Sequence, residues 1–245
     1  MRTVRLLIAF QGTRYDGWQS QRTGRTLQEV FEKHLARILK EKIDLISSSR
    51  TDAGVHARGM AAHFGTRAKL PDAKIKNALN YYLPQDVVVL AARTVSSKFH
   101  ARYSAKSKTY EYLVWNSRTR PAYDLAPYCL WFPSPLDVGN MRKASKYLLG
   151  KHDFSAFRDS GDDERNPVRT IHSIRIRKDG PKVSIQVRAD GFLRHMVRII
   201  AGTLLDVGRG KLLIQHIESN RTAKDRKKTG PTAKPHGLTL LKVQY

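Results

Sequence analysis

The chain has 245 residues, 40% of them hydrophobic, so it is long enough to bury a core and is not a disordered segment. Its 45 Lys and Arg residues against 21 Asp and Glu give a formal net charge of +24. Such an excess of positive charge indicates an acidic partner. Nucleic acid is favoured over an anionic membrane surface, because the charge is spread along the chain and not gathered on one amphipathic helix.

The same composition excludes several classes of protein. The sequence has no run of about 18 apolar residues, so we expect no membrane-spanning helix. The first residues are typical of a strand and lack the apolar segment of a signal peptide. Cys129 is the only cysteine, which excludes an internal disulfide bond and a cysteine-based zinc cluster. We therefore expect a cytoplasmic protein without a metal site.

The first half of the chain contains two helix patterns among four strand patterns. Apolar residues recur at helical spacing over residues 26–40, behind a Thr26–Glu29 capping box. Pro71 opens a second helix that ends near residue 83. Strands are predicted at residues 4–10, 43–49, 60–66 and 87–95. The predicted order is β-α-β-β-α-β, the split β-α-β arrangement.

The second half repeats this order without any repeat in its sequence. The predicted elements are strands at 109–116 and 128–132, a helix at 138–149, a hairpin over 170–189, a helix over 192–207 and a last strand at 238–243. We therefore predict an α+β fold of two subdomains. Residues 1–104 form the first subdomain, and residues 105–245 form the second.

Two polar segments interrupt these patterns. Residues 158–167 contain four carboxylates, at Asp159, Asp162, Asp163 and Glu164. Such a group can bind a metal ion, but it lacks the spacing of a metal site, so a solvated loop is favoured. Residues 221–235 are rich in Lys and Arg. A mobile surface loop and a loop that grips the phosphate backbone fit this segment equally well.

The segment from Ser47 to Arg58 carries the most informative group, a carboxylate between two arginines. It places Asp52 between Arg50 and Arg58, beside small residues and Gly54. A nearby positive charge keeps a carboxylate ionised, so Asp52 has the character of a nucleophile or a base. By its chemistry alone the signal is weak, because an Asp that caps a turn is common.

Short motifs along nearly the whole chain follow one known pattern in order. They are Gly17-Trp18-Gln19 with Gln21, Arg50-Thr51-Asp52-Ala53-Gly54-Val55-His56, Phe99-His100-Ala101-Arg102 with Ser104, Tyr110 with Tyr112, Arg120-Pro121, Asp153-Phe154-Ser155-Ala156-Phe157, Phe192-Leu193-Arg194-His195-Met196-Val197-Arg198 with Gly202, and Gly237-Leu238. This set resembles the motifs of the bacterial tRNA pseudouridine synthase A family. A chance match of so many motifs in the same order is very improbable.

Two departures from the family pattern concern the backbone near Asp52. Phe10-Gln11-Gly12 stands where the family usually has Tyr-Asp-Gly, and three serines, Ser47–Ser49, precede the loop where the family favours Gly. Neither departure changes the aspartate. We expect them to alter details of the first strand and of the loop, and not the type of reaction.

The resemblance implies an isomerase that converts uridine to pseudouridine in tRNA, at positions 38, 39 and 40 of the anticodon stem-loop, on a flipped-out nucleotide. It implies two ferredoxin-like subdomains, with mainly antiparallel sheets, that flank a basic active-site cleft. It also implies a homodimer that holds tRNA across both subunits, with no role for a membrane. No cofactor is expected, because the isomerisation requires neither oxidation nor hydrolysis.

The resemblance also implies roles for five residues. Asp52 is the catalytic carboxylate, acting as nucleophile or base, and Arg50 helps to flip or replace the base. Tyr110 stacks on the uracil or transfers a proton, Arg198 pairs with the aspartate, and Leu238 packs under the ring. From the residues alone, a core aromatic is the better interpretation of Tyr110. A surface arginine in contact with phosphate is the corresponding interpretation of Arg198.

Several other tyrosine, histidine and arginine residues are assigned different roles. Tyr112 has the same strand parity as Tyr110 and is predicted to be structural. His56, His63 and His195 are expected to be structural or in contact with RNA. Arg194, four residues before Arg198 on the predicted helix, is expected to contact phosphate.

Two other functions fit part of the sequence. A non-catalytic RNA-binding protein fits the composition and charge equally well, but it has no need of the Asp52 loop together with Tyr110, Arg198 and Leu238. A synthase that modifies another RNA, or another site in tRNA, would use the same aspartate.

Overall fold

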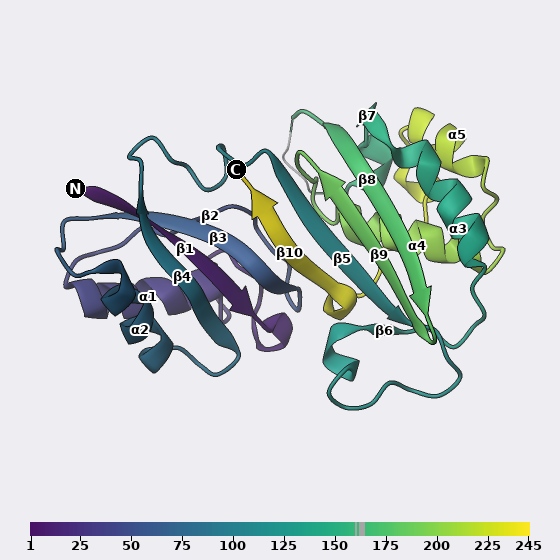
Figure 1. The fold of residues 1–245 in the computed structure, drawn as a ribbon. Coiled ribbons are helices and arrows are strands. Elements are labelled where there is room, and N and C mark those ends of the chain that lie inside the picture. Colours follow the sequence, from purple (N-terminus) through teal and green to yellow (C-terminus); the bar gives the residue numbers. More distant parts are fainter. Residues whose placement is uncertain (160, 162–164) are drawn as a thin grey trace. The chain divides into compact units, whose positions relative to one another are not determined.

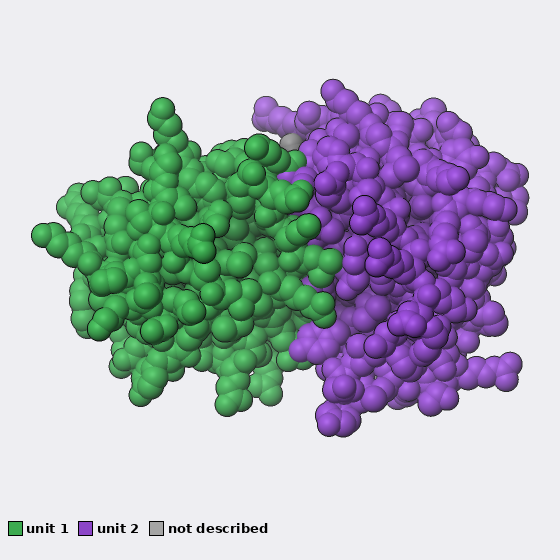
Figure 2. All heavy atoms as spheres, in the orientation of Figure 1, with its two compact units in different colours: residues 1–106, 240–245 green, residues 107–239 purple. Residues whose placement is uncertain are grey.

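The computed structural model describes residues 1–159, 161 and 165–245 (Figure 1). The chain divides into two compact units, coloured separately in Figure 2. Unit 1 consists of residues 1–106 and 240–245, and unit 2 consists of residues 107–239. The chain passes from unit 2 back to unit 1 within its last strand, β10 (Leu238–Gln244). The proposed division into two functional domains near residue 105 stays a prediction.

Unit 1 has the element order that the sequence predicts. Its elements are β1 (Arg2–Phe10), α1 (Leu27–Leu39), β2 (Ile46–Ser47), β3 (His56–Thr66), α2 (Asp72–Tyr82), β4 (Val87–Val95) and the end of β10. β1 pairs antiparallel with β3 and with β4, and β2 pairs antiparallel with β3. The first four strands therefore lie in the order β4-β1-β3-β2.

The prediction of a strand over residues 43–49 is mostly wrong. Of residues 43–49, only Ile46 and Ser47 form strand β2. The serine run that follows bends on itself, because the hydroxyl of Ser47 donates to the carbonyl oxygen of Ser49 at 2.9 Å. β3, in turn, begins four residues earlier than predicted, at His56.

The core of unit 1 lies between its sheet and its two helices. Alternate residues of β1, namely Val4, Leu6 and Ile8, are fully buried, as expected for a strand with one covered face. The apolar side of α1 buries Leu27, Phe31, Leu35 and Leu39, and that of α2 buries Ile75 and Leu79. Figure 1 shows the two helices side by side. Both predicted helices of this half are therefore confirmed.

Unit 2 contains the predicted hairpin and more elements than the sequence indicates. Its elements are β5 (Ser107–Trp115), β6 (Leu130–Trp131), α3 (Val138–Ser145), β7 (Gly150–Asp153), β8 (Val168–Asp179), β9 (Lys182–Ala189), α4 (Met196–Gly208) and α5 (His216–Thr222). The strands lie in the order β5-β9-β8-β7 with antiparallel neighbours, and β6 pairs parallel with β5. An α+β fold with mainly antiparallel pairing is therefore confirmed.

The long helix of unit 2 begins later than predicted. α4 starts at Met196, and its N-cap residue, His195, has a left-handed backbone with a φ of 60°. The His195 Nδ1 lies 3.0 Å from a carboxylate oxygen of Asp159, which holds the residue in this conformation. Arg194 therefore lies outside the helix, and the prediction that it shares the helix with Arg198 is wrong.

The basic segment 221–235 is fixed to α4 in its second half. The Gly230 amide donates to the Thr203 hydroxyl at 2.9 Å, and the Ala233 amide donates to the Arg198 carbonyl oxygen at 3.1 Å. Gly202 leaves room for this approach, because a Cβ there would lie 1.8 Å from the Pro231 carbonyl oxygen. The interpretation as a mobile loop does not hold for these residues.

The predicted acidic loop falls largely outside the described residues, since Asp162, Asp163 and Glu164 are not among them. Asp159 is described, and its amide donates to the Arg194 carbonyl oxygen at 3.3 Å. Within the described part of the chain, none of the helices has the length and apolarity needed to cross a membrane.

Gly202→Ala is expected to destabilise the protein. Alanine is the better helix former by about 1 kcal/mol. Its Cβ would nevertheless displace the Pro231 carbonyl group and the segment attached to it, so we expect a net loss of about 1–3 kcal/mol in the free energy of unfolding. Urea denaturation measures this loss. Gly139→Ala in α3 is the control, because the nearest atom there is a side-chain oxygen of Asp137 at 3.1 Å. Equal stabilities of Gly202→Ala and the wild type would contradict this packing of Gly202 against Pro231.

Candidate active site

The loop between β2 and β3 presents Asp52 at the surface of unit 1. Asp52 is half-buried, and Arg50 is exposed. The Val55 amide donates to the Asp52 carbonyl oxygen at 3.2 Å, which closes a turn, and Gly54 within it has a φ of 78°. His56 then begins β3. Asp52 thus lies in a tight turn directly before strand β3.

The segment that follows β1 holds this turn on both sides of Asp52. The Trp18 amide donates to the Thr51 carbonyl oxygen at 3.0 Å. The Gly54 amide donates to the Tyr15 carbonyl oxygen at 3.3 Å. Because these bonds fix the residue before Asp52 and the second residue after it, the backbone of the turn has little freedom to move.

Two glycines allow the close approach of this segment to the turn. A Cβ on Gly17 would lie 2.5 Å from the Thr51 carbonyl oxygen, and its φ of 92° also disfavours any other residue. A Cβ on Gly12 would lie 1.9 Å from the Val55 carbonyl oxygen. Gly12 is the residue that the Phe-Gln-Gly departure from the family pattern retains, so the departure leaves this contact intact.

Aromatic packing and one buried hydrogen bond anchor the segment in turn. Trp18 is 2% exposed, and its ring lies 5.9 Å from the ring of Phe31 and 6.2 Å from that of Phe10. The Tyr15 hydroxyl donates to a carboxylate oxygen of Asp86 at 2.7 Å. Burial and this hydrogen bond raise the pKa of Tyr15, so the phenol stays protonated as the donor. The turn that holds Asp52 is therefore supported by the core of unit 1.

Exposed arginines lie in the segment after β1 and on either side of Asp52. They are Arg14, Arg22 and Arg25 in that segment, Arg50 before Asp52, and Arg58 in the first residues of β3. The Arg25 guanidinium lies 5.0 Å from the centre of the Tyr15 ring. Exposed arginines of this kind are suited to bind phosphate groups.

Two tyrosines of β5 face the interior of unit 2. Tyr110 is 6% exposed, and its ring meets that of Phe192 edge to face, with the ring centres 5.2 Å apart. Tyr112 is fully buried, and its hydroxyl donates to the Lys234 carbonyl oxygen at 2.8 Å. Burial raises the pKa of Tyr112. The structural role predicted for Tyr112 is confirmed, and the role of Tyr110 toward a nucleotide stays a prediction.

Arg198 and Leu238 are connected through the short segment 233–238. Arg198 Nε donates to the Ala233 carbonyl oxygen at 2.7 Å. Gly237 lies against β5, since a Cβ there would be 2.8 Å from a ring atom of Tyr112, and the buried Leu238 follows it directly. The charge of Arg198 also acts on Tyr112, whose pKa it lowers against the larger effect of burial. Sequence reasoning missed Ala233 and Lys234, which carry no motif and act through their backbone.

The five predicted site residues fall in two units. Asp52 and Arg50 belong to unit 1, whereas Tyr110, Arg198 and Leu238 belong to unit 2. The pairing of Asp52 with Arg198 joins the two units, so it stays a prediction.

His56, His63 and His195 all have structural contacts. His56 Nδ1 accepts from the Gly12 amide at 3.0 Å, and His63 Nδ1 accepts from the Ala101 amide at 3.1 Å. His195 contacts the Asp159 carboxylate at the start of α4. Among residues 1–159, 161 and 165–245, no three His, Cys, Asp or Glu side chains are grouped so that they could hold a metal ion.

Comparisons with known proteins agree on one family. A family model described as tRNA pseudouridine synthase matches residues 6–104 and 144–245. A tRNA pseudouridine synthase A of Thermoanaerobacter sp. (strain X514) is 43% identical over 245 residues, and tRNA pseudouridine synthase A 2 of Clostridium perfringens (strain 13 / Type A) is 44% identical over 245 residues. Both alignments cover 100% of this chain and 100% of the relative.

A solved structure, the archaeal box H/ACA sRNP Nop10-Cbf5 complex, is a more distant match. The alignment covers 93% of this chain and 59% of that chain, at 12% identity and a TM-score of 0.39. The two chains therefore have little similarity in sequence or in structure.

The free energy of unfolding is expected to fall as the pH drops from about 7 to about 5, partly because of His63. Burial, and then the neighbouring His100, lower the pKa of His63 below its usual value. The unfolded chain therefore takes up a proton near pH 6.5, where folded His63 is still neutral, so stability is lost as the pH falls through this window.

His63→Asn keeps an acceptor for the Ala101 amide and should make this fall shallower, by up to about 1.4 kcal/mol per pH unit. Urea denaturation at several pH values measures the slope. His172→Asn, which removes an exposed histidine of β8, is the control. An unchanged slope in His63→Asn would contradict a neutral, buried His63.

Proposed function

Because the chain belongs to the tRNA pseudouridine synthase family and is an isomerase that forms pseudouridine in tRNA, we propose that Asp52 is its catalytic carboxylate. We propose further that its targets are uridines 38, 39 and 40 of the anticodon stem-loop. The observation that supports the first proposal is the turn around Asp52. It is fixed at Thr51 by a 3.0 Å hydrogen bond and at Gly54 by a 3.3 Å hydrogen bond, and Asp52 between them is half-buried.

The reaction requires little beyond a positioned carboxylate. The N1–C1′ bond of uridine breaks, the uracil turns, and a bond forms between C5 and C1′, with one proton lost from C5 and one gained at N1. Atoms and electrons balance without an oxidant, a reductant or water. Asp52 acts either as nucleophile, at C1′ or at the pyrimidine ring, or as a base at C2′. Each role needs an ionised oxygen held at the flipped nucleotide.

Arg50 and three residues of unit 2 complete the proposed site. Arg50 is exposed and lies two residues before Asp52, so its side chain can replace the flipped base in the RNA stack. Tyr110 would stack on the uracil, Leu238 would pack beneath it, and Arg198 would pair with the Asp52 carboxylate. The hydrogen bond of Arg198 Nε to the Ala233 carbonyl oxygen supports this assignment, because it fixes the direction of the guanidinium group.

Binding of tRNA is proposed to rest on phosphate contacts and on shape. The formal charge of +24 and the exposed arginines near Asp52 suit a broad phosphate-binding surface. The basic segment 221–235 and Arg194 are proposed to add to it. Arg194 is exposed and lies 3.8 Å from the Asp159 carboxylate, so a phosphate would compete with that ion pair.

The remaining proposals concern the assembly. The strand order β4-β1-β3-β2 and the β-α-β-β-α-β sequence of unit 1 support a ferredoxin-like subdomain, and β5-β9-β8 in unit 2 follows the same order. We propose a homodimer that holds tRNA over both subunits, with a basic cleft as the active site. A location in the cytoplasm is proposed, as expected for an enzyme of this family that acts on tRNA.

Asp52→Asn and Asp52→Ala are expected to lower pseudouridine formation at least about a thousandfold, the scale on which a catalytic group acts. Affinity for tRNA should change little, because phosphate contacts lie on other residues. Carbodiimide labelling followed by reverse transcription measures the product, and filter binding measures the affinity. Asp44→Asn removes an exposed carboxylate of unit 1 outside the turn and should leave the activity unchanged. Near-normal product in either Asp52 variant would refute the proposed mechanism.

Deletion of the gene is expected to remove pseudouridine from positions 38, 39 and 40 of cellular tRNA and from no other arm. Site-by-site mapping of pseudouridine in total tRNA tests this, and a plasmid copy of the wild-type gene should restore the modification. Loss of pseudouridine outside the anticodon arm would contradict the assigned target and leave the isomerase assignment intact.

A further inference from the structure

The turn formed by residues 99–104 is a rigid feature of unit 1 that the proposed chemistry does not use. It follows β4 and closes on itself, because the Ser104 amide donates to the His100 carbonyl oxygen at 2.9 Å and the His100 amide donates to the Ser104 hydroxyl at 3.0 Å. Inside the turn, the amides of Arg102 and Tyr103 donate to His100 Nδ1 at 3.2 and 3.1 Å. These bonds fix the plane of the imidazole ring.

Tyr103 stacks on that imidazole and is largely exposed to solvent. The two ring centres are 4.3 Å apart, with 28° between the ring planes, and Tyr103 is 76% exposed. The Arg102 guanidinium lies over the Tyr103 ring, 5.6 Å from the ring centre. An exposed aromatic side chain is usually free to rotate, whereas this one is held in place before any partner arrives. A partner that stacks on it therefore loses less affinity to the ordering of the side chain.

The turn is anchored to the rest of unit 1 through the amide and the carbonyl group of Ala101. The Ala101 amide donates to His63 Nδ1 at 3.1 Å, and the Tyr245 hydroxyl donates to the Ala101 carbonyl oxygen at 2.8 Å. The Arg5 guanidinium lies 5.7 Å from the ring centre of Phe99 and 5.6 Å from that of Tyr245. Strand β1, strand β3 and the C-terminal residue thus all hold the turn.

The charge around Tyr103 favours a nucleic acid as its partner. Lys98, Arg102 and Lys106 are exposed, and residues 96–106 contain no Asp or Glu. The segment also lacks Leu, Ile, Val and Met, so it has none of the large aliphatic side chains that form the core of a protein interface. An exposed aromatic ring among cations is the arrangement on which unpaired bases stack.

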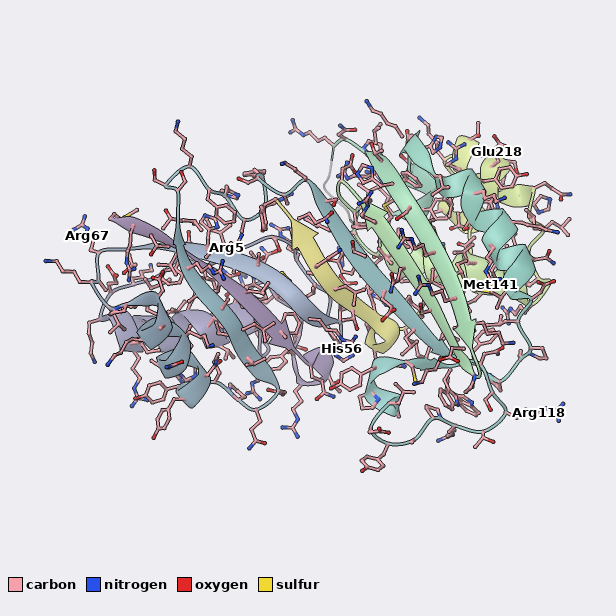
Figure 3. All side chains as sticks on the ribbon, viewed as in Figure 1. Arg5, His56, Arg67, Arg118, Met141 and Glu218 are labelled. Atoms are coloured by element: carbon pink, nitrogen blue, oxygen red, sulfur yellow. The ribbon has the colours of Figure 1, made fainter. Side chains whose placement is uncertain are left out.

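We propose that residues 98–106 form a second RNA-contact site, at which the exposed face of Tyr103 stacks on an unpaired base of the bound tRNA and Lys98, Arg102 and Lys106 contact its phosphates. This proposal rests on the proposed function. β3 runs from His56, beside the Asp52 turn, to His63, beneath the 99–104 turn. Seven residues of strand separate the two turns by on the order of 20 Å. Figure 3 labels His56 and Arg5, which mark these two regions of unit 1.

At that distance Tyr103 acts on affinity and not on the chemical step. Tyr103→Ala in the full-length protein is expected to raise the Kd for an unmodified tRNA transcript roughly tenfold, the scale of one base–aromatic stack. The single-turnover rate at saturating enzyme should stay within about twofold of the wild type. Tyr103→Phe and Tyr103→Trp keep a flat ring and should retain wild-type affinity.

Tyr81→Ala is the matched control, because Tyr81 is 82% exposed and lies on α2, outside the 99–104 turn. It should leave the Kd unchanged. Ultraviolet cross-linking of the wild-type protein to tRNA, followed by mass spectrometry, should give a nucleotide adduct on the peptide that contains Tyr103. An unchanged Kd in Tyr103→Ala, or a Kd raised equally by Tyr81→Ala, would overturn the proposal.

Three further outcomes separate this site from its alternatives. If Tyr103→Ala shifts the protein from dimer to monomer in sedimentation while the cross-link is absent, the surface binds a second copy of the chain and the RNA-contact proposal is wrong. If the wild-type protein binds tRNA through Tyr103 and forms no pseudouridine, the RNA-contact site stands and the proposed function fails. If the wild-type protein is active and its tRNA affinity does not depend on Tyr103, the proposed function stands and the RNA-contact site fails.

Discussion

The turn that holds Asp52 depends on the close approach of two stretches of backbone. A carboxylate that reacts with a flipped nucleotide must be accessible and must also stay in place. Residues 51–55 contribute little side-chain mass that could hold them, so their support comes from the segment after β1, which approaches so closely that Gly12 and Gly17 can carry no side chain. That segment also leads into α1, since the Leu27 amide donates to the Gly17 carbonyl oxygen at 3.1 Å. The helix, the glycines and the aspartate therefore form one rigid body.

In unit 2, glycines likewise allow a close approach of the backbone to the proposed site residues. Gly202 lets the Pro231 carbonyl group reach α4, and Gly237 lets the next turn reach Tyr112. Between these two contacts, Ala233 and Lys234 bond through their backbone to Arg198 and to Tyr112. Backbone groups have few rotatable bonds, so they position a side chain more firmly than another long side chain would. This explains why Ala233 and Lys234, which act only through their backbone groups, connect Arg198 with Tyr112.

The sequence predicts those features whose causes are local. The helix over 26–40 and the hairpin over 170–189 follow from periodicity within the segments themselves, and both are confirmed. The late start of α4 and the packing of the basic segment depend on contacts of Asp159 and Gly202 with residues far away in the sequence, which no local pattern reports. By its local sequence, Asp52 is typical of a turn aspartate. The ordered motifs are the basis for proposing it as the catalytic carboxylate, and the structure adds the contacts that hold its turn.

The two kinds of RNA contact inferred for this chain respond differently to solution conditions. Phosphate contacts of exposed arginines release counterions, so their contribution falls steeply with salt. Stacking on Tyr103 involves no counterion, and any base offers a face to it. An enzyme that modifies neighbouring positions, as proposed for this chain, needs affinity that does not depend on one sequence, and both proposed contacts would provide it. The phosphate contacts bring the RNA to the surface, whereas a fixed aromatic ring on the order of 20 Å from Asp52 would limit how far the RNA can slide past the turn.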